Sequence, residues 1–254
     1  MNIFHEGVKM SKLILVRSAE SEWSNENRFT GWTDVKLSDK GVIDARNAGK
    51  IIKDHNMSVD VLYTSYLKRA IKTSFIILDM LDLMWIPVNR SWRLNERHYG
   101  ALEGLKKSEV ILKYGEEQVQ KWRRSYDAKP PALDKDDDRY PGKDIKYKEL
   151  NPVNIPKSES LKDAMNRAYP IWQQSILNDI RKGKNVLLGT HGNVIRAFIK
   201  EFDRLSDEEV VKLEIPLAIP LVYEFDENCK PVKSYYLATD KRVEEEKKKA
   251  SSVL

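Results

Sequence analysis

The chain has one cysteine among its 254 residues, and this scarcity excludes several architectures. A single thiol, Cys229, cannot form an intrachain disulfide and cannot build a cysteine-based zinc cluster. The four histidines, His5, His55, His98 and His191, include no pair at the i,i+4 spacing of a helical metal site. We therefore expect no disulfide and no bound metal.

Long apolar runs are also missing. Near the start of the chain the longest one, Leu13 to Val16, is too short for a secretory signal or a membrane span. Hydrophobic residues still make up 41% of the chain, which is enough for one large core. The sequence thus predicts a soluble, cytoplasmic protein that does not bind a membrane.

Charge of one sign is scarce as well. The chain carries 44 basic and 39 acidic residues, a net charge of +5, with both signs mixed along most of its length. A nucleic-acid-binding protein more often has a basic block interleaved with exposed aromatic residues. We expect no nucleic-acid partner, and the small positive excess fits an anionic small molecule equally well.

Apolar periodicity predicts strands that alternate with helices. Strands are expected at 12–16, 59–63, 85–88 (at a sheet edge, because it contains Pro87) and 186–188. Helices are expected after Ser38, over 68–81 and 115–126, after Ser160 with a possible kink at Pro170, and after 191–193.

This alternation favours an α/β fold, a three-layer α/β/α sandwich with a mostly parallel central sheet. In such sheets ligands bind beyond the carboxyl ends of the strands. Two expected strands end in polar pairs, Arg17-Ser18 and Thr190-His191, which nominates these ends as the site.

The domain organisation follows from composition. We expect a mobile N-terminal arm at 1–11, one domain at 12–240 and a charged C-terminal tail at 241–254 that lies near the site without an apolar stripe to anchor it. A loop-rich excursion at 128–157 holds five of the ten prolines, and long loops of this kind often serve as lids.

Several motifs occur in a specific order. They are Leu15-Val-Arg-Ser-Ala-Glu-Ser-Glu-Trp23, Arg28-Phe-Thr-Gly-Trp32, Tyr63-Thr-Ser65 with Leu67-Lys-Arg69, Trp92-Arg-Leu-Asn-Glu-Arg-His-Tyr-Gly100, Trp122-Arg-Arg-Ser-Tyr126 and His191-Gly-Asn193. From about Lys12 to about Leu237 the chain resembles the 2,3-bisphosphoglycerate-dependent phosphoglycerate mutases of the histidine phosphatase superfamily. Taken alone, each motif has a plainer explanation, such as a solvated helix face, an ion pair or a turn; their joint order makes the resemblance specific.

The resemblance implies a set of site residues. Arg17 and Arg69 would flank the transferred phosphoryl group, Glu96 would be the general acid/base, and His191 would stabilise the transferring oxygens. Substrate-binding residues by the same resemblance are Thr30, Gly31, Tyr99, Lys107, Arg123, Arg124, Gly192 and Asn193. Arginine suits this task because its planar fork matches carboxylate and phosphate oxygens.

The resemblance also implies ligands and partners. The family interconverts 3-phosphoglycerate and 2-phosphoglycerate in glycolysis through a phosphohistidine, with 2,3-bisphosphoglycerate as cofactor and no metal. We expect phosphorylated glycerates as ligands, and a homodimer or a heterodimer with an active paralogue.

The chain departs from the family pattern around the phosphoryl group. Ser18 stands at the nucleophile position, where the family has histidine, and Ala19 follows where it has glycine. Ser24 replaces an expected asparagine, Val194 an expected serine, and Ile215-Pro-Leu-Ala-Ile-Pro220 stands for Ile-Pro-Thr-Gly-Ile-Pro.

These departures leave three hypotheses. A serine hydroxyl is a weak nucleophile without an adjacent base, although His191 is a candidate base, and a phosphoserine ester is a poor phosphoryl donor. The first hypothesis is a homologue that binds phosphoglycerates with impaired or lost catalysis. The second is an active mutase or weak phosphatase that uses a modified route, and the third is a non-enzymatic regulatory or partner-binding protein.

Overall fold

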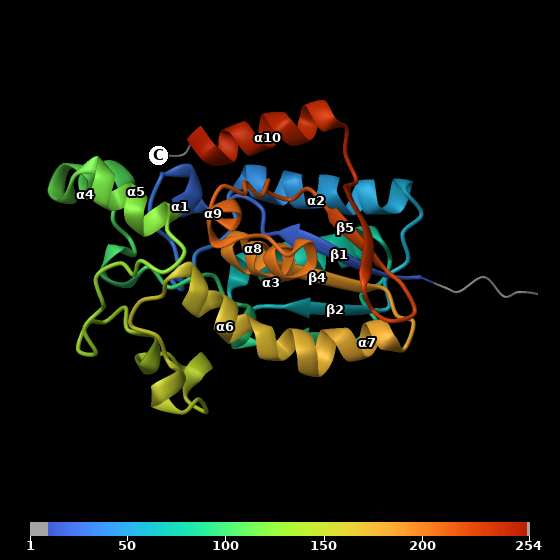
Figure 1. Ribbon diagram of the computed structural model, residues 1–254, viewed down its shortest axis with the longest axis horizontal. Helices are drawn as coiled ribbons and strands as arrows, with labels where there is room; N and C mark the ends of the chain where they lie inside the picture. Colours follow the sequence, from blue (N-terminus) through green and yellow to red (C-terminus); the bar gives the residue numbers. More distant parts are fainter. Residues whose placement is uncertain (1–9, 253–254) are drawn as a thin grey trace, which may run out of the picture.

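The computed structural model describes residues 10–252. They fold around a six-stranded sheet (Figure 1). Its strands, in sheet order, are β3 (Val88–Arg90), β2 (Val61–Thr64), β4 (Val186–Thr190), β1 (Ser11–Arg17), β5 (Leu221–Phe225) and β6 (Pro231–Tyr236). The first four are parallel, while β5 is antiparallel to β1 and β6 is antiparallel to β5. The predicted α/β fold with a mostly parallel sheet is confirmed.

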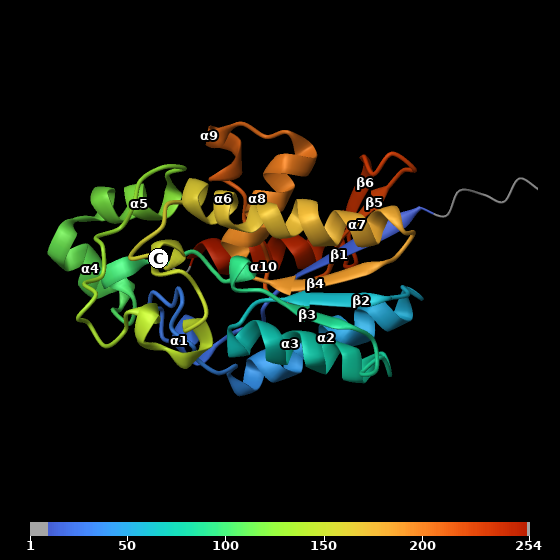
Figure 2. The ribbon, with the colours of Figure 1, turned by 90° about the horizontal axis from the view of Figure 1, so that it is seen from below.

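Helices cover both faces of the sheet (Figure 2). They are α1 (Glu22–Asn25), α2 (Asp39–Asp54), α3 (Lys68–Met80), α4 (Lys107–Tyr114), α5 (Glu116–Arg124), α6 (Leu161–Ile171), α7 (Leu177–Arg181), α8 (Gly192–Asp203), α9 (Asp207–Val210) and α10 (Asp240–Ser252). Side chains alternate along β1, so that Leu13 and Leu15 pack with α6 to α8, whereas Ile14 and Val16 pack with α2 and α3. The strand is therefore apolar on both faces, as expected of a buried parallel strand.

The predicted excursion at 128–157 contains three short 3₁₀ helices, Pro141–Lys143, Ile145–Tyr147 and Pro152–Asn154. It is packed against the domain, because Leu133, Tyr140 and Tyr147 form an apolar cluster with Trp32. Two further 3₁₀ helices, Trp92–Leu94 and Gly100–Leu102, flank the segment that holds Glu96.

Some local predictions need correction. The edge strand lies at Val88–Arg90 rather than 85–88, and Trp85 is 79% exposed in the turn before it. At Pro170, where a kink is expected, α6 continues to Ile171, and a π-helical segment, Trp172–Ile176, then joins it to α7. The last two strands, β5 and β6, had no counterpart in the sequence-based prediction.

The two chain ends also differ from expectation. Of the predicted arm, residues 1–9 lie outside the described residues, whereas Ser11 already belongs to β1 and pairs with Phe225. Most of the predicted tail is helix α10; residues 253–254 are outside the described part. Val243 is only 4% exposed, so α10 does have an apolar anchor, contrary to the prediction. Within the described residues, no helix is long and apolar enough to cross a membrane.

The predicted start of α6 at Ser160 is confirmed and can be tested. The Ser160 hydroxyl accepts a hydrogen bond from the Asp163 amide at 3.1 Å, and Asp163 accepts one from the Ser160 amide at 2.8 Å. Ser160→Ala should lower the free energy of unfolding by about 1 kcal/mol, because it removes an N-cap. Urea denaturation measures this. Ser108→Ala, at an exposed position of α4, is the control and should change stability by no more than about 0.5 kcal/mol. Equal effects of the two changes would contradict the capping role.

Candidate active site

A cavity of about 270 Å³ lies at the carboxyl ends of β1 and β4. The two strands are paired in parallel with Arg17 opposite Thr190, and the Ser18 amide donates to the Thr190 carbonyl at 2.7 Å. This pairing brings Ser18 and His191 to one edge of the sheet. The cavity is lined by every site residue that the sequence nominated: Arg17, Ser18, Thr30, Gly31, Arg69, Glu96, Tyr99, Lys107, Arg123, Arg124, His191, Gly192 and Asn193.

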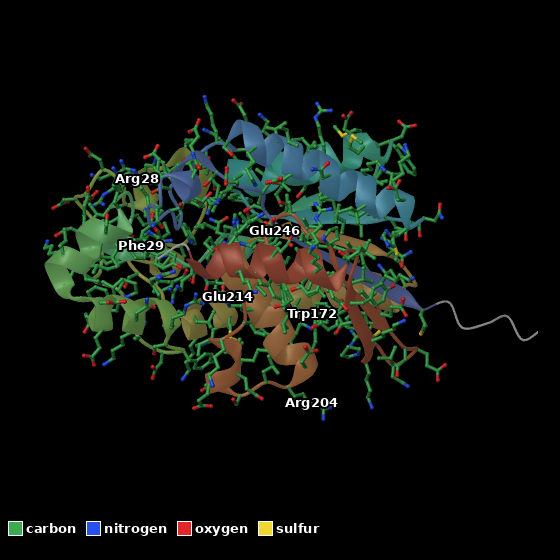
Figure 3. The ribbon with its side chains drawn as sticks, turned by 90° about the horizontal axis from the view of Figure 1, so that it is seen from above. Arg28, Phe29, Trp172, Arg204, Glu214 and Glu246 are labelled. Carbon is green, nitrogen blue, oxygen red and sulfur yellow. The ribbon has the colours of Figure 1, made fainter. Side chains whose placement is uncertain are left out.

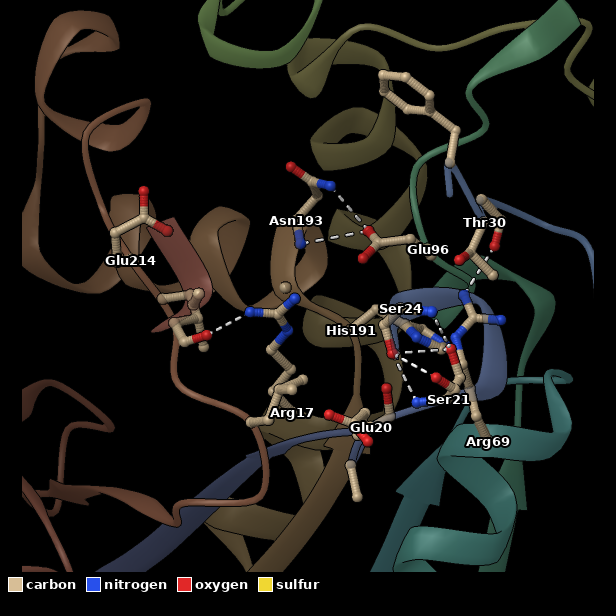
Figure 4. Close-up of a pocket in the computed structure, with 18 of the residues that line it drawn as sticks. Arg17, Glu20, Ser21, Ser24, Thr30, Arg69, Glu96, His191, Asn193 and Glu214 are labelled. Carbon is tan, nitrogen blue, oxygen red and sulfur yellow. Dashed lines mark hydrogen bonds between the residues drawn. The ribbon is translucent and has the colours of Figure 1, made fainter. Parts of the chain in front are cut away.

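The segment after Ser18 turns into the short helix α1. Ser18 is 6% exposed, and Ser21 caps α1. The Ser24 hydroxyl accepts a hydrogen bond from the Ser21 amide at 2.7 Å and donates to the Ser21 carbonyl at 2.8 Å (Figure 4). Ser24 thus uses its hydroxyl to close the first turn of α1, although it also lines the cavity.

Arg17 and Arg69 are fixed by backbone carbonyl groups. Arg17 donates through Nη1 to the Ile215 carbonyl at 2.5 Å, and Arg69 donates through Nη2 to the Gly31 carbonyl at 2.7 Å. A further Arg69 bond, from Nη1, reaches the Thr33 carbonyl at 3.1 Å. Burial lowers the pKa of both guanidinium groups, although Glu96 acts in the opposite direction. These charges are therefore preorganised and poorly hydrated, which suits an anion.

Two glycines allow the backbone to approach closely. Gly31 has φ of +53°, and a Cβ atom there would lie 1.9 Å from Glu103 Oε1. Glu103 accepts hydrogen bonds from the Trp32 amide at 3.0 Å and the Tyr99 amide at 2.9 Å, which ties the two loops together. A Cβ atom on Gly192 would lie 3.3 Å from Arg17 Nε.

Glu96 is held at the first turn of α8. Its Oε1 accepts hydrogen bonds from Asn193 Nδ2 at 3.0 Å and from the Arg97 amide at 2.8 Å. The Asn193 amide lies 3.3 Å from the same oxygen, and Asn193 Nδ2 lies 3.4 Å from the Tyr99 hydroxyl. Burial raises the pKa of Tyr99, but the charge of Arg97, whose guanidinium stacks 4.5 Å from the Tyr99 ring, and hydrogen bonds from Asn193 and Arg97 together outweigh it, so that this pKa is lowered.

His191 is 1% exposed, and its Nε2 lies 2.9 Å from the Ser65 hydroxyl. Burial, together with nearby arginine charges, lowers its pKa well below the ordinary histidine value. The imidazole is therefore neutral at pH 7. Among the described residues, the Ser18 hydroxyl has no hydrogen bond to His191 or to any other base.

Lys107, Arg123 and Arg124 reach the cavity from α4 and α5. Burial, and the charges of Arg123, Arg17 and Arg124, lower the pKa of Lys107 to about 7. The lysine is therefore about half protonated at pH 7, and an anion that binds beside it will draw a proton onto it.

Sequence reasoning missed several lining residues, among them Arg28, Lys40, Arg196 and Glu214. Arg196 follows Asn193 by three positions, so the helical period after His191 would have placed it on the same face of α8. Glu214 directly precedes the Ile215–Pro220 motif, but its orientation depends on tertiary contacts.

Helix α10 closes one side of the cavity. Glu246, Lys249 and Ala250 contribute to the lining, and Figure 3 shows α10 crossing the molecule with Glu246 on it, beside the position of Glu214. The charged end of the chain is thus part of the site wall, in keeping with its predicted place near the site.

A metal centre has no visible basis in this site. Within residues 10–252, no group of three or more histidine, cysteine, aspartate and glutamate side chains is placed to hold a metal ion. Metal-free chemistry nevertheless stays a prediction.

A buried cationic cavity at the strand ends of an α/β sheet, with a histidine and a glutamate in its wall, is suited to bind an anion. The family model of the histidine phosphatase superfamily (branch 1) matches residues 13–140 and 133–237, and the chain belongs to this superfamily.

Solved structures share the fold at low sequence identity. YhfR from Bacillus stearothermophilus is 23% identical, with a TM-score of 0.67 over 87% of this chain and 94% of that one. A mycobacterial glucosyl-3-phosphoglycerate phosphatase is 17% identical, with a TM-score of 0.66 over 89% and 97%. A phosphoglycerate mutase from Bacillus anthracis is 20% identical, with a TM-score of 0.63 over 90% and 93%. At these identities the likeness establishes the fold alone.

The lowered pKa of Lys107 gives a prediction for anion binding. Sulfate binding at pH 8 should take up as much as about 0.9 proton per anion, since a lysine of pKa about 7 is mostly neutral there and becomes charged beside the anion. Affinity should therefore fall as the pH rises above about 7. Calorimetry in two buffers of different ionisation enthalpy measures the uptake. Lys107→Arg should abolish it, because arginine stays charged; unchanged uptake in this variant would assign the proton to another group.

Proposed function

We propose that this chain is a phosphoglycerate mutase homologue that binds 3-phosphoglycerate and 2,3-bisphosphoglycerate, with catalysis impaired or lost because Ser18 occupies the phosphoryl-acceptor position. The observation that carries the proposal is the assembly of five cationic side chains, Arg17, Arg69, Lys107, Arg123 and Arg124, around one cavity that also holds Glu96 and His191. A phosphoglycerate carries a carboxylate and a phosphate, and such a set of arginines and a lysine suits both.

In this proposal each residue has a chemical task. Arg17 and Arg69 hold the phosphoryl oxygens, while Lys107, Arg123 and Arg124 hold the other anionic groups. Thr30, Gly31 and Gly192 provide a hydroxyl and close backbone contacts, and Tyr99 and Asn193 orient the substrate. Glu96 exchanges a proton with the substrate hydroxyl, and its hydrogen bonds from α8 keep it in place.

The step that this chain is least suited to perform is the attack of Ser18 on a phosphoryl group. Activation of Ser18 needs a base whose pKa is near the working pH, and the pKa of His191 is far below it. The phosphoserine ester that would form is also a poor donor for the next transfer. These two facts favour impaired catalysis over an active mutase or a weak phosphatase.

The wider predictions come from the sequence alone: the cytoplasmic location from its composition, and the rest from the resemblance. A place in glycolysis, a cytoplasmic location, and a homodimer or a heterodimer with an active paralogue remain predictions.

Ligand binding is the first test. At 100 times its dissociation constant, 3-phosphoglycerate should add about 2.7 kcal/mol to the free energy of unfolding, because it binds the folded state alone. Thermal shift at low salt measures this. Arg123→Met should weaken binding about tenfold or more, since it removes a charged hydrogen-bond donor. Lys121→Met, exposed on the same helix, is the control and should leave affinity within about threefold. Absence of any shift at millimolar ligand would refute phosphoglycerate binding and leave the partner-binding hypothesis.

The nucleophile is the second test. Ser18→His should take up an acid-labile radioactive phosphoryl group from labelled 2,3-bisphosphoglycerate, because it restores an imidazole beside Arg17. Turnover should stay low until Ala19→Gly and Ser24→Asn are added, and the combined gain should exceed the separate gains, since residues of one site are not additive. The wild-type chain is the control and should acquire no acid-labile label. Equal labelling of wild type and triple variant would show that another residue is the acceptor.

A further inference from the structure

Glu214 places a negative charge in the wall of the cationic cavity. Its Oε1 lies 2.6 Å from Arg124 Nη2 of α5, and its Oε2 lies 3.7 Å from Arg196 Nη2 of α8. The carboxylate therefore bridges two helices of the site. In the view of Figure 4 it stands at the left, with Arg17, Glu96 and His191 between it and the side that holds Ser24 and Arg69.

Glu214 is held firmly in this position. Arg196 donates through Nε to the Leu213 carbonyl at 2.8 Å and through Nη1 to Asn193 Oδ1 at 3.1 Å. On the other side of Glu214, the Ile215 carbonyl accepts the bond from Arg17. The backbone on both sides of Glu214 is thus tied to arginines of the site, and a ligand cannot push the segment aside without breaking these bonds.

The consequence is that Arg124 is already paired with a carboxylate of the chain itself. A ligand anion that approaches Arg124 has to compete with Glu214 at 2.6 Å, and it also meets the repulsion of this second negative charge. Glu20, Glu96 and Glu246 also line the cavity, but Glu20 accepts a hydrogen bond from the Ser38 hydroxyl, Glu96 faces amides of α8, and Glu246 pairs with Lys249 of its own helix. Glu214 is the lining carboxylate that pairs with a nominated anion-binding arginine and partly neutralises its charge.

We propose that Glu214 determines specificity, so that the cavity prefers a ligand with one phosphate, such as 3-phosphoglycerate, over a doubly phosphorylated one, such as 2,3-bisphosphoglycerate. This inference rests on the proposed function for the identity of its ligands. A second phosphate adds about −1.5 to −2 charge at pH 7. Glu214 repels this added charge, and Arg124 offsets it less because Glu214 already neutralises part of its charge. Glu214 acts as a built-in anion that takes the place of the second phosphate.

The experiment compares dissociation constants for two ligand pairs at fixed low salt. One pair is 3-phosphoglycerate and 2,3-bisphosphoglycerate; the other is inorganic phosphate and pyrophosphate, which differ in charge but contain no glycerate. Glu214→Gln keeps the shape and removes the charge, whereas Glu214→Asp keeps the charge. Glu246→Gln removes a different carboxylate from the same cavity wall and is the matched control. Melting temperatures verify that each variant is folded.

Glu214→Gln should shift the affinity ratio toward the more highly charged ligand by about tenfold in each pair, whereas Glu214→Asp and Glu246→Gln should shift it by less than about threefold. An unchanged ratio in Glu214→Gln, or an equal shift in Glu246→Gln, overturns the proposal. If phosphoglycerates bind no variant but the pyrophosphate ratio still shifts, the proposed function fails and the role of Glu214 stands.

A second measurement does not depend on the folding of a Glu214 variant. In the wild-type background, Arg124→Met leaves the Glu214 carboxylate without its 2.6 Å partner, so it should weaken 2,3-bisphosphoglycerate binding about tenfold more than 3-phosphoglycerate binding. Lys121→Met, exposed on the same helix, is the control and should change this ratio by less than about threefold. An unchanged ratio in Arg124→Met would mean that Glu214 does not repel the second phosphate, which overturns the proposal.

Discussion

The parallel pairing of β1 with β4 is the constraint on which the site depends. It sets Arg17 opposite Thr190, and the backbone bond from Ser18 to Thr190 extends the pairing one residue beyond the strands. Residues 172 positions apart, Ser18 and Thr190, thereby become neighbours at one sheet edge. The pairing is stable because apolar side chains leave β1 on both faces and are covered by helices on each side. The polar ends of these strands are consequently where the charged groups of this site converge.

Convergence of so many cations has an electrostatic cost, and the structure offsets it in two ways. Carbonyl groups of Gly31, Thr33 and Ile215 accept hydrogen bonds from Arg17 and Arg69. Carboxylates also contribute, and Glu214 lies 2.6 Å from Arg124. Burial, and the repulsion that remains uncompensated, lower pKa values in the site, most clearly that of Lys107. An anion that enters the cavity relieves this repulsion, which is the physical reason to expect tight binding of a phosphorylated ligand.

The same electrostatics weaken the chemistry. Burial, and after it the charges of the nearby arginines, disfavour a protonated His191, so the imidazole is a weak base. A nucleophile that is itself an imidazole needs no such base, whereas the hydroxyl of Ser18 does. The cavity is therefore better suited to hold a phosphoryl compound than to accept its phosphoryl group, and this separation of binding from catalysis is the central feature of the proposed function.

The sequence by itself determined the fold class and nominated many of the residues that line the cavity. Local patterns can be recognised in the sequence because burial and capping depend on a few neighbouring residues. They include the continuous apolar strands, the helix cap at Ser160 and the ordered motifs. It did not predict β5 and β6, nor the apolar anchor of α10 at Val243. Only the tertiary structure decided which charges meet: Glu214 looks like any surface glutamate until α5 and α8 bring Arg124 and Arg196 to it. Ion pairs between distant segments produce no periodic pattern in the sequence, because Coulomb attraction depends on distance in space and not on separation along the chain.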